Sequence, residues 1–243
     1  MRILTLPGVF QPRADGRLLA ATLRERGLAR RASVLDLFTG SGALALAAAR
    51  EGARSVTAVD VSRRAVLTVR INARRNGLRV RARRGDLFAP VAGERFDLIL
   101  ANPPYVPSAG EALPRHGAAR AWEGGPDGRA LIDRLIAQAP AHLRAGGTLL
   151  LVHSSLCGER ATLERLAAAG LRGEVLARQR GPLGPLMQAR AELLERRGLL
   201  ARGHREEQLL VIAGTVSPAP ARGSAQMRSP SPDATTKERS WQS

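Results

Sequence analysis

Cysteine, histidine, lysine and aromatic residues are all scarce in this chain of 243 residues. The single cysteine, Cys157, excludes an internal disulfide, and four histidines are too few to favour a Cys/His zinc site. No run of apolar residues reaches the length that a membrane span needs. The N-terminus lacks the apolar core and cleavage site of a signal peptide. We therefore expect a cytoplasmic protein without a metal centre or membrane contact.

The positive charge is carried almost entirely by arginine. The formal net charge is +17 and the isoelectric point is about 11.7, yet Lys237 is the only lysine. Such a charge is typical of proteins that bind nucleic acid. The arginines are scattered, however, apart from the segment 79–84, and abundant alanine, glycine and proline indicate the codon bias of a G+C-rich genome. Nucleic-acid binding is therefore open but not favoured.

Short apolar segments alternate with longer amphipathic segments between residues 33 and 213. The predicted strands are 33–37, 55–59, 80–84, 96–101, 148–153, 175–179 and 208–213. The predicted helices are 18–26, 43–50, 63–76, 128–143, 159–169 and 187–197. This alternation predicts an α/β fold of the Rossmann-like, doubly wound kind, with a mostly parallel seven-stranded sheet and helices on both faces.

The composition divides the chain into three parts. Residues 1–31 are expected to form an N-terminal segment and a helix that packs on the core, and residues 32–216 the main domain. Residues 217–243 are rich in serine, proline, alanine and charge, and they have almost no apolar periodicity. They are expected to form a disordered tail, because such a composition cannot bury enough apolar surface to fold.

The segment Asn102-Pro103-Pro104-Tyr105 is the most informative motif. It follows the apolar run 96–101, and two prolines in succession cannot continue a strand, so the chain leaves the sheet at its carboxyl edge. Ligands of open α/β sheets bind at that edge. The Asn102 side chain and the Pro103 carbonyl offer two acceptors for a planar –NH2 group, and Tyr105 offers a flat ring.

Polar residues also follow the other predicted strands. A glycine-rich turn, Asp36 to Gly42, links the first strand to a helix, as in nucleotide-type ligand sites. Asp60 ends the second strand, where a carboxylate can accept from both hydroxyls of a ribose. Asp86 follows the third strand, where it can accept from an adenine amine with Leu87 against the ring. Together with Asn102, these residues suit one extended adenosyl ligand.

These motifs resemble those of class I S-adenosylmethionine-dependent methyltransferases, and more closely the HemK/PrmC-type glutamine N5-methyltransferases that modify translation release factors. The resemblance covers about residues 1–214 and matches the short branch without the N-terminal helical domain. The segments that carry it are 7–15, 36–42, 60–62, 85–88, 96–106, 116–117 and 121–128. Phe38 stands where the family usually has glycine, and Gly16 where it has threonine or serine.

The resemblance implies S-adenosyl-L-methionine as cofactor, a release factor as protein substrate and, as in eukaryotic relatives, a small activator subunit. Gly40 and Gly42 would approach the methionyl part of the cofactor. The full cofactor-binding set is Asp36, Thr39, Gly40, Ser41, Gly42, Asp60, Asp86, Leu87 and Asn102. The expected catalytic residues are Asn102, Pro103, Pro104 and Tyr105.

Three other functions remain open from the sequence. An adenine-N6 methyltransferase acting on nucleic acid would meet the same planar –NH2 group, although no added target-recognition domain is present for base flipping. A small-molecule N-methyltransferase is the second alternative. The third is a non-catalytic cofactor-binding protein, which the unusual Phe38 and Gly16 would support.

Overall fold

The computed structural model describes residues 1–11 and 13–217. The predicted tail beyond residue 217 lies outside the described residues. The strands are β1 (Ser33–Leu37), β2 (Ser55–Asp60), β3 (Arg81–Arg84), β4 (Phe96–Ala101), β5 (Leu143–Ser154), β6 (Leu171–Pro182) and β7 (Glu206–Val216). The helices are α1 (Ala14–Glu25), α2 (Ala43–Arg50), α3 (Arg63–Arg75), α4 (Ala130–His142), α5 (Glu159–Ala168), α6 (Pro185–Gln188) and α7 (Ala191–Arg196).

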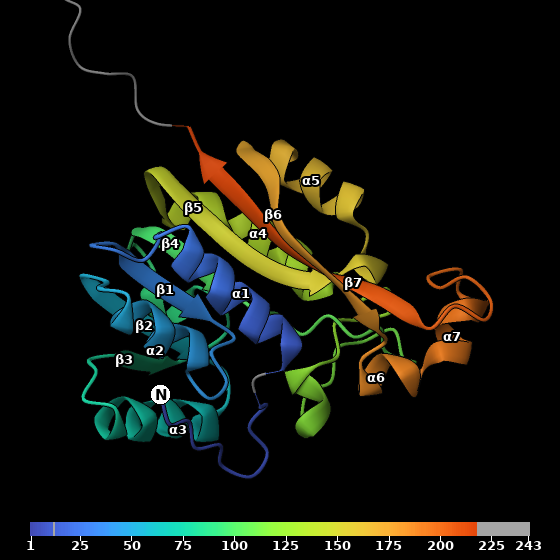
Figure 1. The fold of residues 1–243 in the computed structure, drawn as a ribbon, viewed down its shortest axis with the longest axis horizontal. Coiled ribbons are helices and arrows are strands. Elements are labelled where there is room, and N and C mark those ends of the chain that lie inside the picture. Colours follow the sequence, from blue (N-terminus) through green and yellow to red (C-terminus); the bar gives the residue numbers. More distant parts are fainter. Residues whose placement is uncertain (12, 218–243) are drawn as a thin grey trace, which may run out of the picture.

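The strands form one sheet of seven in the order β3-β2-β1-β4-β5-β7-β6 (Figure 1). Neighbours from β3 to β5 are parallel, and β7 runs antiparallel between β5 and β6. The strand order reverses direction at β1, whose neighbours are β2 and β4, so a crevice opens at the carboxyl ends of these strands. The predicted mostly parallel, doubly wound sheet is confirmed.

Neighbouring residues of a strand pack into two separate cores on opposite faces of the sheet, because side chains alternate between the faces of a strand. On one face, Val34 and Leu98 pack with apolar residues of α1, α2 and α3. On the other face, Leu35 and Ile99 pack with α4 and α5. Both faces are thus covered by helices, which explains why these strands are apolar throughout rather than alternating.

The first residues of the chain are tied to α3 by two asparagines. The Asn72 side chain accepts from the Leu4 amide at 2.9 Å and donates to the Leu4 carbonyl at 2.8 Å. Asn76 makes the same pair of bonds with Arg2. This anchoring leads the chain past the carboxyl edge of the sheet, where the Phe10 carbonyl lies beside Gly40, and into α1.

The connection between β6 and β7 holds a third, smaller core. Leu183, Met187 and Leu194 of this connection pack against Val106 and the partly buried Tyr105 and Trp122. The predicted single helix over 187–197 is wrong here, since α6 and α7 are separated at Ala189 and Arg190. Pro185 begins α6, as expected of proline in a first helical turn.

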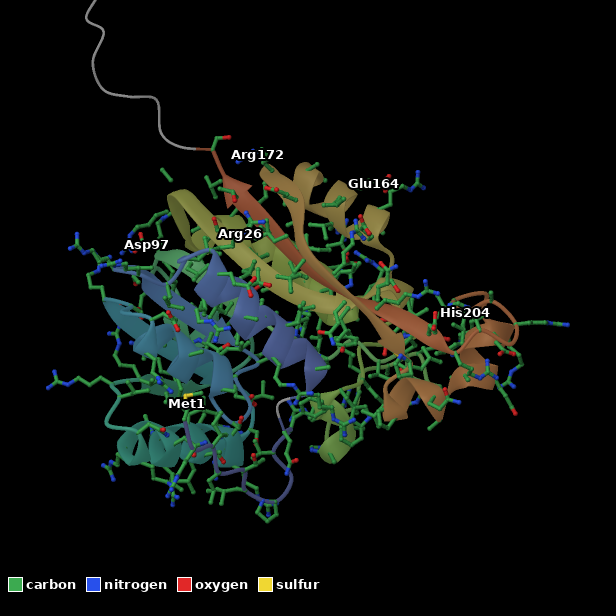
Figure 2. The ribbon with its side chains drawn as sticks, viewed as in Figure 1. Met1, Arg26, Asp97, Glu164, Arg172 and His204 are labelled. Carbon is green, nitrogen blue, oxygen red and sulfur yellow. The ribbon has the colours of Figure 1, made fainter. Side chains whose placement is uncertain are left out.

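Three strands, β5, β6 and β7, are longer than the apolar pattern indicates. β5 begins at Leu143, the last residue of the predicted helix 128–143, and its pairing with β4 is irregular between Phe96–Leu143 and Leu98–Thr148. Charged side chains such as Asp97, Glu164 and Arg172 lie at the periphery (Figure 2).

Among the described residues, no helix combines the length and the apolar character that crossing a bilayer needs.

Candidate active site

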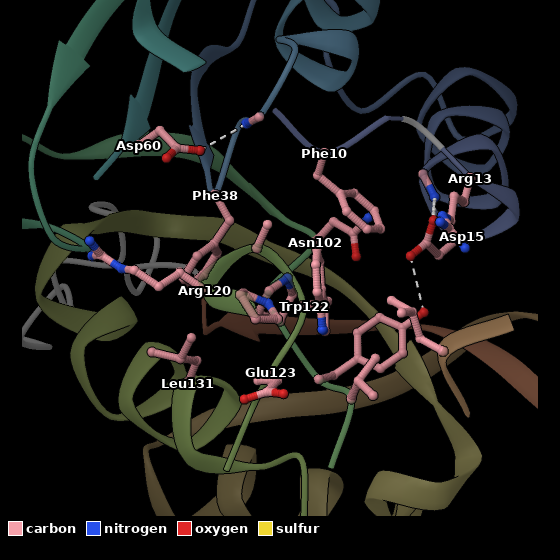
Figure 3. A pocket seen from close by; sticks show the side chains of 18 of the residues that line it. Phe10, Arg13, Asp15, Phe38, Asp60, Asn102, Arg120, Trp122, Glu123 and Leu131 are labelled. Atoms are coloured by element: carbon pink, nitrogen blue, oxygen red, sulfur yellow. Dashed lines mark hydrogen bonds between the residues drawn. The ribbon is translucent and has the colours of Figure 1, made fainter. Parts of the chain in front are cut away.

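A cavity of about 1040 Å³ lies at the carboxyl edge of the sheet (Figure 3). At one end it is lined by the turn after β1 and by Asp60, and at the other by the β6–α6 segment and Glu207. Asn102 and Asp15 line the same cavity. The structure therefore brings the polar strand ends and the Asn-Pro-Pro-Tyr segment into one space. No group of three His, Cys, Asp or Glu side chains that could hold a metal ion occurs within residues 1–11 and 13–217.

Asp36, near the end of β1, hydrogen-bonds both to the glycine-rich turn that follows and to the start of α2. It is fully buried, and its Oδ2 accepts from the Thr39 hydroxyl at 2.5 Å and from the Ala45 amide at 3.0 Å. Burial raises the pKa of Asp36 from 3.8 to about 7, against the lowering effect of these two bonds. Asp36 does not line the cavity, whereas Thr39, which it binds, does, and the expected cofactor contact of Asp36 stays a prediction.

We expect Asp36→Asn to make stability less dependent on pH. The folded protein keeps a proton on Asp36 that the unfolded chain releases between pH 3.8 and about 7. The free energy of unfolding therefore falls by roughly 1–4 kcal/mol as pH rises through this window, and asparagine removes that fall. Urea unfolding of both proteins across the window measures the difference, and parallel pH profiles would contradict it.

The two glycines of the turn have different functions. Gly40 lines the cavity and has a φ of +52°. Gly42 has a φ of +83°, and a Cβ there would lie 3.0 Å from Val69 of α3, so this glycine allows α2 to pack on α3. Gly42 does not line the cavity, and its expected contact with the cofactor stays a prediction. Phe38, which lines the cavity, also has a positive φ of 57°, a conformation that usually favours glycine.

Asp60 fastens the same turn from the neighbouring strand. Its Oδ2 accepts from the Gly40 amide and its Oδ1 from the Ser62 amide, both at 2.9 Å. Burial raises the pKa of Asp60, and Arg120 across the cavity counteracts this (Figure 3). Each carboxylate oxygen still has a free lone pair, so Asp60 can accept two further hydroxyl hydrogens.

Asp86 is paired with a cation in the structure. Its Oδ2 lies 2.7 Å from Arg134 of α4, with both side chains about half exposed. Exposed ion pairs contribute little to stability, so this pair can open for a ligand at small cost. Leu87 is buried at the cavity wall in a left-handed conformation, with a φ of 45°.

The Asn-Pro-Pro-Tyr segment presents unused acceptors. Neither the Asn102 carboxamide nor the Pro103 carbonyl has a hydrogen-bond partner among the described residues. Pro103 and Pro104 are buried, whereas the Tyr105 hydroxyl donates to Asp15 Oδ2 at 3.0 Å. Burial, followed by the nearby charge of Asp15, raises the pKa of Tyr105 well above 10, so its hydroxyl stays neutral.

The loop that contains Trp122, Gly124 and Gly128 packs against the backbone of this segment. The Val106 amide donates to the Trp122 carbonyl at 2.7 Å, and the Gly124 amide donates back to Val106 at 3.0 Å. A Cβ on Gly124 would lie 2.6 Å from the Pro104 carbonyl oxygen, and one on Gly128 only 2.2 Å from that of Tyr105. The glycines of this loop are therefore needed for close approach of two backbones.

Several cavity residues have no local sequence signal. Phe10, Asp15, Arg120 and Glu207 line the cavity, although the sequence assigns them no site role. Asp15 is separated from Tyr105 by 90 residues, so no spacing rule predicts the contact. Phe10 and Asp15 belong to the segment 7–15, which is one of those that carry the family resemblance. Membership in that segment was the one sequence feature that could have pointed to a site role for them.

Solved structures with this fold include several methyltransferases. A 16S rRNA N2 G1207 methyltransferase of T. thermophilus, in complex with AdoMet and guanosine, matches with a TM-score of 0.60 and 24% identity, over 87% of this chain and 46% of that one. The E. cuniculi Mtq2–Trm112 complex, responsible for methylation of the termination factor eRF1, matches with a TM-score of 0.59 and 23% identity, over 86% and 99%. The protein thus has the class I methyltransferase fold.

Sequence relatives narrow the class to a family. The methyltransferase small domain family matches residues 1–115. A Methanocaldococcus jannaschii protein, provisionally named a protein N5-glutamine methyltransferase, is 35% identical over 181 residues, which are 74% of this chain and 90% of the relative. A release factor glutamine methyltransferase of Gloeobacter violaceus is 42% identical over 146 residues, 56% of this chain and 50% of that enzyme. The chain belongs to the protein N5-glutamine methyltransferase family, and the predicted family is confirmed.

Proposed function

We propose that the protein transfers a methyl group from S-adenosyl-L-methionine to the side-chain amide nitrogen of a glutamine in a translation release factor. The observation that carries the proposal is the pair of unpartnered acceptors, Asn102 Oδ1 and the Pro103 carbonyl, beside the ring of Tyr105. A primary amide has two N–H hydrogens in one plane, and this set offers one acceptor for each. The names of the relatives point to the same substrate class.

The cavity suits the cofactor at its sheet end. Asp60 would hold the ribose hydroxyls with its two remaining lone pairs, and Asp86 and Leu87 would meet the adenine. Thr39, Gly40 and Ser41 line the cavity where the methionyl part would lie, with Asp36 and Gly42 holding their turn. When bound, S-adenosylmethionine supplies a methyl group on a positively charged sulfur, which is already an activated leaving group.

Asn102 and Pro103 would act on the nucleophile. The lone pair of an amide nitrogen is delocalised into its carbonyl, so the nitrogen reacts poorly. Acceptance of both N–H hydrogens by these two oxygens would localise the lone pair towards the methyl donor and stabilise the charge that develops on nitrogen. The nitrogen gains the methyl group and loses one hydrogen as a proton. No strong base is needed, because the proton can leave late and most of the rate gain comes from positioning.

The remaining parts of the proposal concern an activator subunit and the cellular location. A small activator subunit is proposed by analogy with the two-protein complex among the structural neighbours. A cytoplasmic location, where release factors act, is part of the same proposal.

A methyl-transfer assay with tritium-labelled S-adenosylmethionine tests the function. The acceptors are the release factors of the same cell, variants with Gln→Ala in their Gly-Gly-Gln loop, and single-stranded and duplex DNA and RNA. We expect label on the unaltered release factor alone. Label on nucleic acid would transfer the assignment to adenine methylation, and label on the Gln→Ala variant would place the modified residue elsewhere.

A further inference from the structure

Tyr105, the only tyrosine of the chain, is held by a carboxylate from the start of α1. Asp15 is 5% exposed, and both of its oxygens are engaged. Oδ2 accepts from the Tyr105 hydroxyl at 3.0 Å, and Oδ1 accepts from the Gly16 amide at 2.7 Å. The Gly16 amide therefore fixes the Asp15 carboxylate against its own backbone, with Oδ2 directed at the Tyr105 hydroxyl.

The same turn of helix lies beside the other end of the motif. A Cβ on Gly16 would lie 3.8 Å from Asn102 Nδ2, so the start of α1 approaches the carboxamide without bonding to it. Tyr105 is also held at its backbone, because the Cys157 thiol donates to the Tyr105 carbonyl at 3.4 Å. With its hydroxyl bound to Asp15, the ring is tethered at both ends.

We infer that Asp15 is a positioning residue for methyl transfer, acting through the Tyr105 hydroxyl. By fixing the ring, Asp15 would keep the flat wall against which the plane of the substrate amide is aligned with the acceptors of Asn102 and Pro103. This inference rests on the proposed function. Asp15 acts through Tyr105 because, among the described residues, the Tyr105 hydroxyl is the one side-chain group that Asp15 binds.

The charges around Tyr105 favour this arrangement. Asp15 and Glu207 are the carboxylates that face its hydroxyl, and Cys157 is buried nearby. A neutral phenol can donate to Asp15, whereas a phenolate would be repelled by both carboxylates in a buried site. The hydroxyl is therefore retained as a donor to Asp15 at neutral pH.

Three variants separate positioning from folding. Asp15→Ala and Tyr105→Phe each remove one partner of the hydrogen bond, and Glu25→Ala removes an exposed carboxylate from the last turn of the same helix. We expect kcat for the glutamine substrate to fall roughly tenfold to a hundredfold in the first two, with the double variant no slower than either. The dissociation constant of S-adenosylmethionine should stay within about twofold, and Glu25→Ala should match wild type. Multiplicative losses in the double variant, or an unchanged Tyr105→Phe, would overturn the inference.

A second readout does not require activity. Because Tyr105 is the only tyrosine, the NMR signal of isotope-labelled tyrosine reports its titration alone. Asp15→Asn removes the charge, so the pKa of Tyr105 should move down from its raised value, while Glu25→Ala should leave it in place. An unchanged titration would disprove the contact. If the titration shifts but wild type labels no glutamine, the contact stands, and both the proposed function and the positioning role based on it fail.

Discussion

Asn102→Ala should lower turnover by about three orders of magnitude and leave the affinity for S-adenosylmethionine nearly unchanged. Loss of one pre-positioned group that stabilises developing charge typically costs a factor of about 10²–10³ in kcat. Here the loss falls at the top of that range, because Asn102 would also align the amide with the methyl donor. Single-turnover kinetics and calorimetry on the same preparation give the two quantities.

Two controls make this result specific to the acceptor. Asn102→Asp keeps an oxygen acceptor and should recover part of the rate that alanine loses, whereas a purely structural asparagine would tolerate aspartate no better than alanine. Asn76→Ala removes a carboxamide outside the cavity that binds Arg2 and the end of α3, and should leave kcat close to wild type. Equal losses in kcat and cofactor affinity for Asn102→Ala would contradict the catalytic role.

Gly128→Ala should have the largest effect on folding among single changes near the cavity. The added Cβ would lie 2.2 Å from the Tyr105 carbonyl oxygen and 3.0 Å from the Cys157 sulfur, at a residue whose φ is +79°. Neither backbone can yield without moving the Asn-Pro-Pro-Tyr segment. We expect a loss of roughly 3–5 kcal/mol in the free energy of unfolding, together with loss of methyl transfer.

Gly77→Ala is the matched control for backbone strain alone. Gly77 has a φ of +65° at the end of α3, but a Cβ there would meet nothing within 4 Å. Its replacement should cost only about 1–2 kcal/mol. Urea unfolding of both variants measures the difference, and equal destabilisation would show that the contact with Tyr105 does not matter.

Elements with strong local patterns could be predicted from the sequence, and tertiary contacts could not. The bounds of β1, α2 and β4 agree with the prediction, because each is a short apolar segment between clear turn residues. The break between α6 and α7 was missed, because the apolar residues on both sides follow one helical period. Their common core with Val106 forms only after the chain folds.

In the candidate site, too, positions that follow from strand ends could be predicted, and positions that depend on tertiary packing could not. Asp60, Asp86 and Asn102 could be placed at one edge because parallel strands end together, and the structure confirms that all three line one cavity. The sequence could not show that Asp36 and Gly42 lie behind the turn rather than on the cavity wall, since that depends on the packing of α2 and α3. The contact of Asp15 could not be predicted for another reason, because its partner Tyr105 is 90 residues away in the sequence.

The antiparallel strand β7 has a consequence for how such an enzyme can diversify. The connection between β6 and β7 leaves the sheet after the strand pair Pro182–Glu206, and most residues of the third, small core come from it. It also lines the cavity through Leu186 and Met187, next to Glu207 at the start of β7. Insertions, deletions or exchanges in this connection would reshape the acceptor end without passing through the two main cores. A lineage can therefore acquire new acceptors by exchanging one hairpin while the methyl-donor half stays unchanged.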